Sequence, residues 1–185
     1  MSDPSASWYC HFSSPVGELV LTSDGEALTR LHLPLRDGSA APLSGPGWLQ
    51  DNGPFREALS QLCAYFEGER TDFDLPLRMA GTPFQRMAWD ALLTIPYGTT
   101  ISYAEQARRI GRPGASRAVG AANGRNPIAI IVPCHRVIGS CGSLTGYGGG
   151  LPLKEWLLDH EGCVLGRREK ARRAGPTLQA ARRGA

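Results

Sequence analysis

Long hydrophobic runs are absent from this sequence. No stretch of its 185 residues approaches the roughly 18 consecutive apolar residues that a membrane-spanning helix needs. The N-terminal residues MSDPSASWYCHF also lack the charged start and the apolar stretch of a signal peptide. We therefore expect a cytoplasmic protein without a membrane partner, whose length suffices for one ample hydrophobic core or for two modest ones.

A disulfide framework is absent as well. The number of cysteines is odd, and their positions follow no framework spacing: Cys10, Cys63, Cys134, Cys141 and Cys163. Such a pattern favours reduced thiols in a reducing compartment over disulfide bonds. At least one of these thiols is therefore a candidate for chemistry.

The first half of the chain lacks net positive charge. Residues 1–100 hold 6 Arg and Lys against 12 Asp and Glu, which gives a net charge of −6. Residues 101–163 hold 7 against 4, and residues 164–185 hold 7 against 1, which gives +3 and +6. A polyanion would be repelled by the first part and attracted to the rest. Residues 164–185 also lack apolar periodicity, and we predict a basic, mobile tail there, either a nonspecific DNA arm or a solvated terminus.

The first 75 residues have the pattern of a small α/β domain. Apolar and polar residues alternate in short runs over residues 8–33, with turn residues between the runs, which predicts a small antiparallel sheet. A loop rich in Gly, Pro and Ser follows over 34–53, and apolar residues at helical spacing predict one helix over 54–68. Residues 1–75 are therefore expected to form an α/β scaffold domain.

Helices predominate in the rest of the chain up to the tail. Residues 82–95 begin with a Thr cap and a Pro at the first helical position, and residues 152–162 have the pattern of a final helix. Two short helices, 102–111 with a Ser–Glu capping box and 115–123 built of small residues, are joined by a tight turn that contains glycine. This is the outline of a helix-turn-helix. Residues 82–163 are therefore expected to form a mainly α C-terminal domain.

The segment IAIIVPCHRVIG places a reactive pair of residues after an apolar run. Residues 128–132 predict a buried strand, and Cys134 and His135 follow directly after Pro133. Adjacent residues of a strand point to opposite faces, so the thiol and the imidazole cooperate only if Pro133 begins a turn or if a water bridges them. The motif therefore predicts an irregular backbone at this point.

Cysteine is nucleophilic as the thiolate, and a neighbouring base or cation lowers its pKa from about 8.5 into roughly the 3.5–7.5 range. His135 and Arg136 are the neighbouring candidates for this effect, and Glu161 is a candidate partner that would orient the imidazole. The alternative is that Cys134 is a small buried apolar residue beside a surface histidine. The pair alone does not decide between these interpretations.

The wider sequence around this pair resembles a known family. NPIAIIVPCHRVIG, GYGGGLPLKEWLLDHEG and SYAEQARRIGRPGASRAVGAANGRNP are similar to the O6-alkylguanine-DNA alkyltransferases, the bacterial methylated-DNA–protein-cysteine methyltransferases. The resemblance is nearly continuous over residues 82–162. The first 75 residues resemble the family's N-terminal domain more loosely, through SSPVGELVLTSDG and LCAYFEGE, and residues 164–185 have no counterpart.

The resemblance implies a DNA repair protein that consumes its own cysteine. Cys134 would take the alkyl group from O6 of a damaged guanine, after the nucleotide has been flipped out of the duplex, and would keep it in a single turnover. His135 is then the general base, linked to the thiol by a water, Glu161 holds the histidine, and Asn126 braces the turn. The expected partner is double-stranded DNA that contains O6-alkylguanine, with O4-alkylthymine as a second candidate lesion. A monomer is expected, with clustering on DNA left open.

Further site residues follow from the same resemblance. Tyr103 matches a tyrosine that donates a proton to N3 of the departing base, and Lys154 matches a lysine near the active site. Arg117 matches the arginine that fills the space left by the flipped base, on a helix that enters the minor groove. The resemblance assigns three residues to the alkylguanine pocket: Tyr147, Gly148 and Val137. Some relatives have serine at the position of Gly148, so the smaller glycine would widen the pocket here.

The small residues of the second short helix fit this minor-groove role. They would let the helix sit close to DNA, although packing against a neighbouring helix would explain them too: Ala115, Ser116, Ala118, Gly120 and Ala121.

No metal and no other cofactor is predicted. Some family members bind zinc in the N-terminal domain, but the spacing of the nearest candidates does not reproduce that site: Cys10, His11, His32 and Cys63. A second set matches no common zinc finger, and coordination would quench the nucleophile: Cys134, Cys141, His160 and Cys163.

Two other functions remain as alternatives. A non-catalytic alkyltransferase-like protein would recognise lesions without transfer, but such relatives replace the acceptor cysteine, which this chain retains. A cysteine hydrolase would use Cys134 and His135, but it leaves Arg117, Tyr103 and the helix-turn-helix unexplained.

Overall fold

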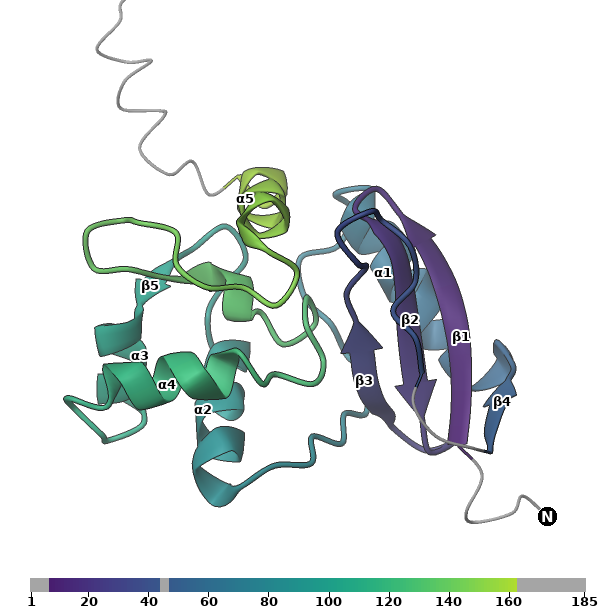
Figure 1. Cartoon of the computed structure of the whole chain (residues 1–185), viewed down its shortest axis with the longest axis horizontal. Coiled ribbons are helices and arrows are strands. Elements are labelled where there is room, and N and C mark those ends of the chain that lie inside the picture. Colours follow the sequence, from purple (N-terminus) through teal and green to yellow (C-terminus); the bar gives the residue numbers. More distant parts are fainter. Residues whose placement is uncertain (1–6, 44–46, 163–185) are drawn as a thin grey trace, which may run out of the picture.

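The computed structural model describes residues 7–43 and 47–162. Figure 1 shows a β-sheet with one helix on one side of the molecule and a cluster of short helices on the other. This arrangement confirms the predicted fold class, an α/β part followed by a mainly helical part. No helix of the described residues has the length and apolar character needed to cross a membrane.

The N-terminal sheet has the strand order β3–β2–β1–β4. Strand β1 (Ser7–Ser14) pairs antiparallel with β2 (Gly17–Ser23), and β2 pairs antiparallel with β3 (Leu28–His32), as the alternating pattern predicts. Strand β4 (Trp48–Gln50) runs parallel to β1, so the expectation of a purely antiparallel sheet, with a loop over 34–53, is wrong at this point. Three residues are too few to produce a visible alternation, which explains why the sequence does not reveal β4.

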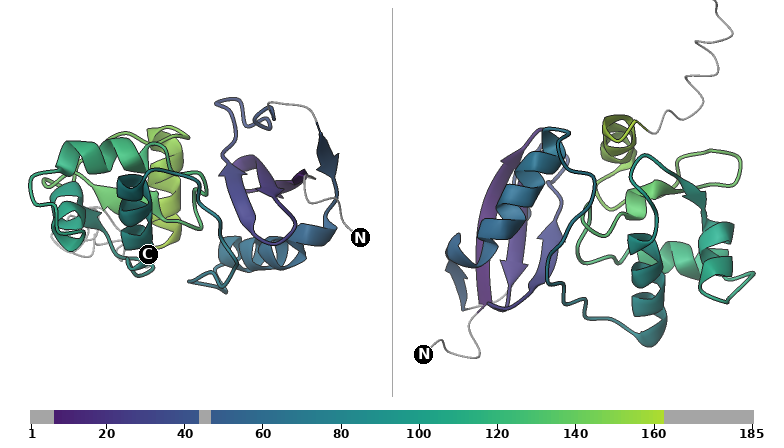
Figure 2. Two further views of the ribbon diagram at one scale, coloured as in Figure 1. Left: turned by 90° about the horizontal axis from the view of Figure 1, so that it is seen from below. Right: turned by 180° about the vertical axis from the view of Figure 1, so that it is seen from behind.

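Helix α1 (Arg56–Phe66), preceded by the 3-10 turn η1 (Gly53–Phe55), covers one face of this sheet, as Figure 2 shows from behind. Its residues Ala58, Leu62 and Tyr65 join Leu19 and Leu21 of β2 in the core. The same core continues into the helical part through Trp89 and Leu92. The two parts therefore share one hydrophobic core and are held against each other by it.

The helical part contains α2 (Pro83–Leu93), α3 (Tyr103–Arg109), α4 (Ser116–Asn123) and α5 (Leu151–His160). The expected cap of α2 is present, because Thr82 and Gln85 form a complete capping box. The Ser102–Glu105 box before α3 is only half formed, because the Glu105 carboxylate pairs with arginines on α3 instead. Two short strands, β5 (Ile101–Ser102) and β6 (Val137–Ile138), pair in parallel beside the helices.

A buried amide pair fixes the two helices of the helix-turn-helix. Gln106 of α3 donates to Asn123 Oδ1 at 3.1 Å, and Asn123 of α4 donates back to Gln106 Oε1 at 2.7 Å. Gln106 also donates to the Ala88 carbonyl of α2 at 2.9 Å, and Trp89 of α2 donates to the Ala122 carbonyl of α4 at 2.9 Å. These bonds tie all three helices together, so the helix-turn-helix outline predicted from the sequence is present.

Residues 128–132 are buried as predicted, but the expectation of a strand is wrong. Only Ile128 makes a β-bridge, to Leu31 of β3. The chain then turns on itself, with Val132 N–H donating to the Ile128 carbonyl at 2.9 Å and with Ile130 at a φ of 72°. An apolar run predicts burial, but it does not distinguish a strand from a buried turn that has no neighbouring strand to pair with.

We expect Gln106→Leu to lower the free energy of unfolding by about 1–3 kcal/mol, because it leaves the Asn123 amide unpaired in the core and removes the bond to the Ala88 carbonyl. Urea unfolding of the purified protein measures this change. Gln50→Leu, at an exposed glutamine of β4, is the control and should change the stability by less than about 0.5 kcal/mol. Equal stabilities of the two variants would contradict the role given to the amide pair.

Candidate active site

Cys134 begins a single 3-10 turn, η2 (Cys134–Arg136), and is buried, with 7% of its surface exposed. Pro133, with φ −83° and ψ 64°, leads the backbone out of extended geometry just before the thiol. The irregular backbone that the Pro-Cys-His order predicts is therefore found. The turn places the thiol at the boundary between the core and an adjoining cavity.

Asn126 holds this turn from within. Its Nδ2 donates to the Val132 carbonyl at 2.7 Å and to Cys134 Sγ at 3.2 Å, while its Oδ1 accepts from the Ile128 N–H at 3.0 Å. One side chain therefore closes both ends of the buried segment and contacts the Cys134 thiol directly. This geometry fits the bracing role expected for Asn126.

His135 and Glu161 form a close, fully buried pair. His135 Nε2 lies 2.7 Å from Glu161 Oε1, and neither side chain is exposed. Because an ionised carboxylate only accepts hydrogen bonds, we assign the proton to Nε2. His135 Nδ1 is then the acceptor nitrogen, and it has no hydrogen-bond partner among the described residues. The imidazole is thus in the tautomer that a general base requires.

Arg136 neutralises Glu161 rather than facing the thiol. Its Nε donates to Glu161 Oε2 at 2.8 Å and its Nη2 to Oε1 at 3.0 Å, while Nη1 donates to the Ile95 carbonyl at 2.6 Å. The sequence offered Arg136 as a cation that could lower the pKa of Cys134. In the structure its charge is taken up by the carboxylate instead.

Two further donors to Glu161 were not foreseen. Tyr65 Oη, on α1 of the N-terminal part, donates to Oε1 at 2.9 Å, and the Gly98 N–H donates to Oε2 at 3.3 Å. Tyr65 is 96 residues away along the chain, so no local pattern could reveal the contact. Burial by itself would raise the pKa of Glu161, but His135 and Arg136 hold that pKa at about 2. Glu161 is therefore a fixed anion.

Burial favours the neutral forms of both the Cys134 thiol and the His135 imidazole. Burial raises the pKa of the Cys134 thiol, against the smaller effects of the Asn126 hydrogen bond and the Lys154 charge. Burial lowers the pKa of His135, against the effect of Glu161. Both shifts disfavour a thiolate–imidazolium pair.

Lys154 holds residues 139–150, the glycine-rich segment GSCGSLTGYGGG, in place beside the site. Its side chain is fully buried, and Nζ donates to the carbonyls of Val137 at 2.6 Å and Thr145 at 3.0 Å. Tyr103 Oη also donates to the Thr145 carbonyl, at 3.3 Å, and Lys154 Nζ lies 5.8 Å from the centre of the Tyr103 ring. Lys154 and Tyr103 thus donate to the same carbonyl, that of Thr145. Burial lowers the pKa of Lys154.

Two adjoining cavities meet at Tyr147 and Gly148. The larger, of about 570 Å³, lies between α4 and the glycine-rich segment and is lined by Tyr103, Arg117 and Gly120. The smaller, of about 350 Å³, holds the Cys134 thiol. The predicted pocket residues Tyr147 and Gly148 line both cavities, whereas the Val137 side chain is buried in the core and lines neither of them.

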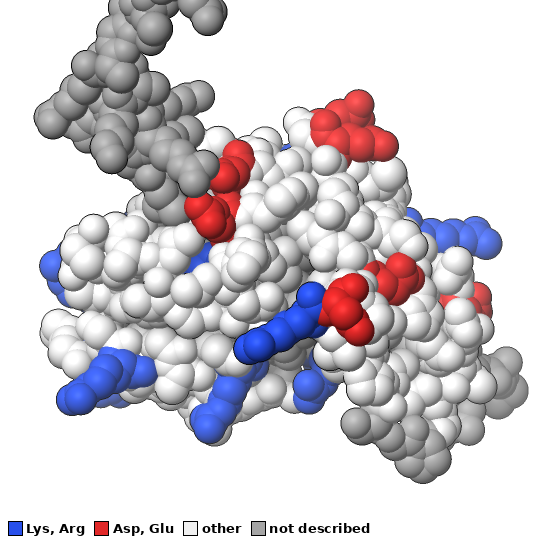
Figure 3. All heavy atoms as spheres, turned by 45° about the horizontal axis from the view of Figure 1, so that its top comes forward, with Lys and Arg blue, Asp and Glu red and all other residues white. Residues whose placement is uncertain are grey.

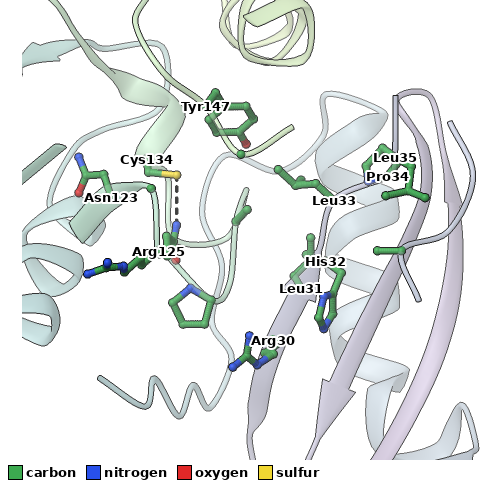
Figure 4. A pocket seen from close by; sticks show the side chains of 16 residues that line it. Arg30, Leu31, His32, Leu33, Pro34, Leu35, Asn123, Arg125, Cys134 and Tyr147 are labelled. Carbon is green, nitrogen blue, oxygen red and sulfur yellow. Dashed lines mark hydrogen bonds between the residues drawn. The ribbon is translucent and has the colours of Figure 1, made fainter. Parts of the chain in front are cut away.

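The smaller cavity is closed by the N-terminal part. Figure 4 shows Cys134 and Tyr147 on one side of it, with Arg30, His32 and Leu33 from β3 and the following loop on the other. Sequence reasoning did not assign these residues to the site, because nothing in the β3 pattern indicates which element its end will face.

The small residues of α4 differ in exposure. Ala118 and Ala121 are exposed, as is Arg117, so they are accessible to a DNA groove. Gly120 faces Tyr103 instead, where a Cβ atom would lie 3.6 Å from the ring. The predicted positions Ala115 and Ser116 are half-buried at the start of the helix. Figure 3 shows Lys and Arg side chains mainly over the helical part and Asp and Glu mainly over the N-terminal part, as the uneven charge distribution predicts.

The candidate zinc ligands do not come together in the part of the chain that the structure describes. No group of three or more His, Cys, Asp or Glu there is placed to hold a metal ion. Cys10 is a buried free thiol, and Cys63 and Cys141 are exposed free thiols. Cys163 and the basic tail, 164–185, lie outside the described residues.

Comparison with known proteins places both parts of the chain. Residues 8–79 match the model of the ribonuclease-like domain of 6-O-methylguanine DNA methyltransferases, and residues 83–163 match the model of their DNA binding domain. The chain is 58% identical to a methylated-DNA–protein-cysteine methyltransferase of Mycobacterium leprae over 148 residues, which are 80% of this chain and 88% of the relative.

Solved structures agree with these matches. The crystal structure of the Mycobacterium tuberculosis O6-methylguanine methyltransferase has a TM-score of 0.77 and 54% identity, and the match covers 84% of this chain and 92% of that one. Mycobacterium tuberculosis OGT in complex with DNA has a TM-score of 0.77 and 55% identity, covering 83% and 92%.

We expect Arg136→Leu to lower the free energy of unfolding by about 3–5 kcal/mol at pH 7, because it leaves Glu161 buried without its compensating charge. In the wild type, the depressed pKa of Glu161 stabilises the fold fully above the unfolded-state value of 4.5, and this stabilisation is lost as the pH falls through about 2. We expect the pKa of Glu161 to be higher in the variant, so the stability difference should shrink as the pH falls from that higher pKa toward about 2.

Urea unfolding at several pH values measures this difference. Arg78→Leu, at an exposed arginine that pairs with Asp24 and Glu26, is the matched control and should cost less than about 1 kcal/mol. Equal costs for the two substitutions would contradict the central role of the Arg136–Glu161 pair.

Proposed function

The chain belongs to the family of methylated-DNA–protein-cysteine methyltransferases, which are DNA repair proteins, and we propose that Cys134 is the residue that accepts the alkyl group. The observation that carries this assignment is the chain of contacts behind the thiol. Cys134 is braced by Asn126, and the adjacent His135 has a free acceptor nitrogen and a partner carboxylate in Glu161. Nucleophile, base and orienting group are therefore present together.

The transfer is a displacement at a saturated carbon. Cys134 Sγ attacks the carbon bonded to guanine O6; the S–C bond forms as the C–O bond breaks, and the electron pair of the broken bond remains on the guanine. The thiol proton passes through a bridging water to His135 Nδ1, and Glu161 stabilises the imidazolium. No cofactor is consumed. The S–C bond is stable, so each chain reacts once.

The departing guanine leaves more readily if its charge is neutralised. Tyr103 lines the larger cavity, and the hydrogen bond from its hydroxyl to the Thr145 carbonyl is long, at 3.3 Å, so the hydroxyl can turn from Thr145 to donate to N3 of a base placed there. The buried charge of Lys154 lies beside the Tyr103 ring and favours the negative charge that develops during transfer. The backbone of Tyr147 and Gly148, at the junction of the two cavities, is placed to face O6.

The protein binds DNA through its C-terminal domain, and the proposed substrate is double-stranded DNA with a flipped-out O6-alkylguanine. Arg117 projects from α4 at the mouth of the larger cavity, where it can occupy the space that the extruded base leaves. Exposed Ala118 and Ala121 allow α4 to approach the minor groove closely. We propose that the protein acts as a monomer in the cytoplasm, where its thiols remain reduced.

The decisive test is incubation with a duplex that contains O6-methylguanine, followed by mass spectrometry. We expect a stoichiometric gain of one methylene per chain on the peptide that contains Cys134, and no gain in Cys134→Ser. Cys141→Ser, at an exposed free thiol, is the control and should react like the wild type. DNA binding without a mass gain would favour a lesion-binding protein, and repeated turnover would indicate a hydrolase.

We also expect Arg117→Ala to slow transfer from duplex DNA about tenfold or more, because base flipping costs a few kcal/mol and the variant cannot fill the vacated stack. Transfer from free O6-benzylguanine, which needs no flipping, should change less than about twofold. Arg56→Ala, which removes an exposed charge from α1, is the control for net charge. Equal losses on duplex and free base would refute the proposed role of Arg117.

A further inference from the structure

We propose that Tyr65 of the N-terminal domain is a positioning residue for alkyl transfer, because it fixes the Glu161 carboxylate on which His135 depends. The inference rests on the proposed role of His135 as the base. Tyr65 Oη donates to Oε1 at 2.9 Å, the same oxygen that accepts from His135 at 2.7 Å. The N-terminal domain, which holds no reacting atom, therefore reaches His135 through a single residue, Glu161.

The hydrogen bonds of Glu161 show what Tyr65 contributes. Oε1 accepts from Tyr65, His135 and Arg136, and Oε2 accepts from Arg136 and the Gly98 N–H. Tyr65 is the donor among these that comes from the N-terminal domain. Removing its hydroxyl leaves Oε1 with one donor fewer in a site with almost no water contact, and it releases the carboxylate from α1. His135 would then lose its fixed orientation.

The Tyr65 ring is itself held rigidly. It is fully buried and contacts Phe66, Phe73, Tyr97 and His160, with centroid distances of 5.3, 5.3, 6.1 and 5.1 Å. Only two side-chain torsions orient a tyrosine, and this packing restricts both, so the position of the hydroxyl is set by the core. Such a rigid donor is suited to fixing a carboxylate that three torsions would otherwise leave adjustable.

A second contact from the same domain points to the same conclusion. The Leu31 N–H of β3 donates to the Pro127 carbonyl at 2.9 Å, next to the Asn126 that braces the thiol. The N-terminal domain thus fixes the segment that leads to Cys134, and through Tyr65 it fixes the carboxylate behind His135. Nucleophile and base are each positioned from this domain.

The experiment compares Tyr65→Phe with Tyr97→Phe. Tyr97 lies in the same interface, but its hydroxyl donates to the His160 carbonyl at 3.3 Å rather than to Glu161, and both substitutions keep the ring. Single-turnover transfer from an O6-methylguanine duplex is measured between pH 5 and 9, together with DNA affinity and urea unfolding. The wild-type arm tests the proposed function on its own, because an absence of transfer there would reject that function and not the role of Tyr65.

We expect Tyr65→Phe to slow transfer about tenfold to a hundredfold, as for the loss of a hydrogen bond to a charged group, with DNA affinity unchanged. With one donor fewer, Glu161 holds an imidazolium more strongly, so the pH at which transfer becomes half-maximal should move upward. Tyr97→Phe should change the rate less than about twofold. In a Glu161→Gln background, Tyr65→Phe should have no further effect on the rate.

Three results would overturn the proposal. A wild-type rate and pH profile in Tyr65→Phe would show that the hydroxyl is dispensable. Equal slowing by the two Phe variants, without a shift in the pH profile, would reduce Tyr65 to a packing residue. Additive effects of Tyr65→Phe and Glu161→Gln would mean that Tyr65 does not act through the carboxylate.

Discussion

The rest of the active site depends on one buried anion, the Glu161 carboxylate. An isolated carboxylate in such a place would cost several kcal/mol and would take up a proton instead. The bidentate pair with Arg136 prevents this, and the remaining lone pairs are used by His135, Tyr65 and the Gly98 N–H. Because its donors come from separate segments of the chain, the anion joins these segments at one point. The charge of Glu161 is therefore compensated only when these segments have come together in the folded protein.

This arrangement explains how a nucleophile can be buried without being inert. Arg136 neutralises Glu161, so the carboxylate does not hold a permanent imidazolium, and the pKa of His135 stays below its usual value because of burial. In the proposed function, Cys134 is then a neutral thiol beside a neutral base. We expect proton transfer only when an electrophile is in place, which suits a reagent that is consumed once and that would be wasted by reaction with other alkylating compounds.

Sequence reasoning succeeded where the cause was local. The Thr82 cap, the helix-turn-helix and the break in the backbone at Pro133 all follow from neighbouring residues, and the structure contains them. It failed for residues 128–132, because burial does not reveal whether a strand partner exists. The contact of Tyr65 with Glu161 could not be predicted either, since nothing in LCAYFEG indicates which carboxylate the hydroxyl will meet 96 residues later.

The acidic N-terminal part and the basic C-terminal part of the chain have different roles in the proposed function, which explains the uneven charge. An acidic domain is an obstacle to DNA only if it shares the contact surface. The acidic side chains in Figure 3 lie mainly over the N-terminal part, whereas Arg117 is exposed on α4 of the helical part. The N-terminal domain acts instead through neutral groups at its inner edge, the Tyr65 hydroxyl and the Leu31 N–H. Neutral donors can fix the Glu161 carboxylate without changing the potential that DNA encounters, so in the proposed function positioning and attraction are divided between the two domains.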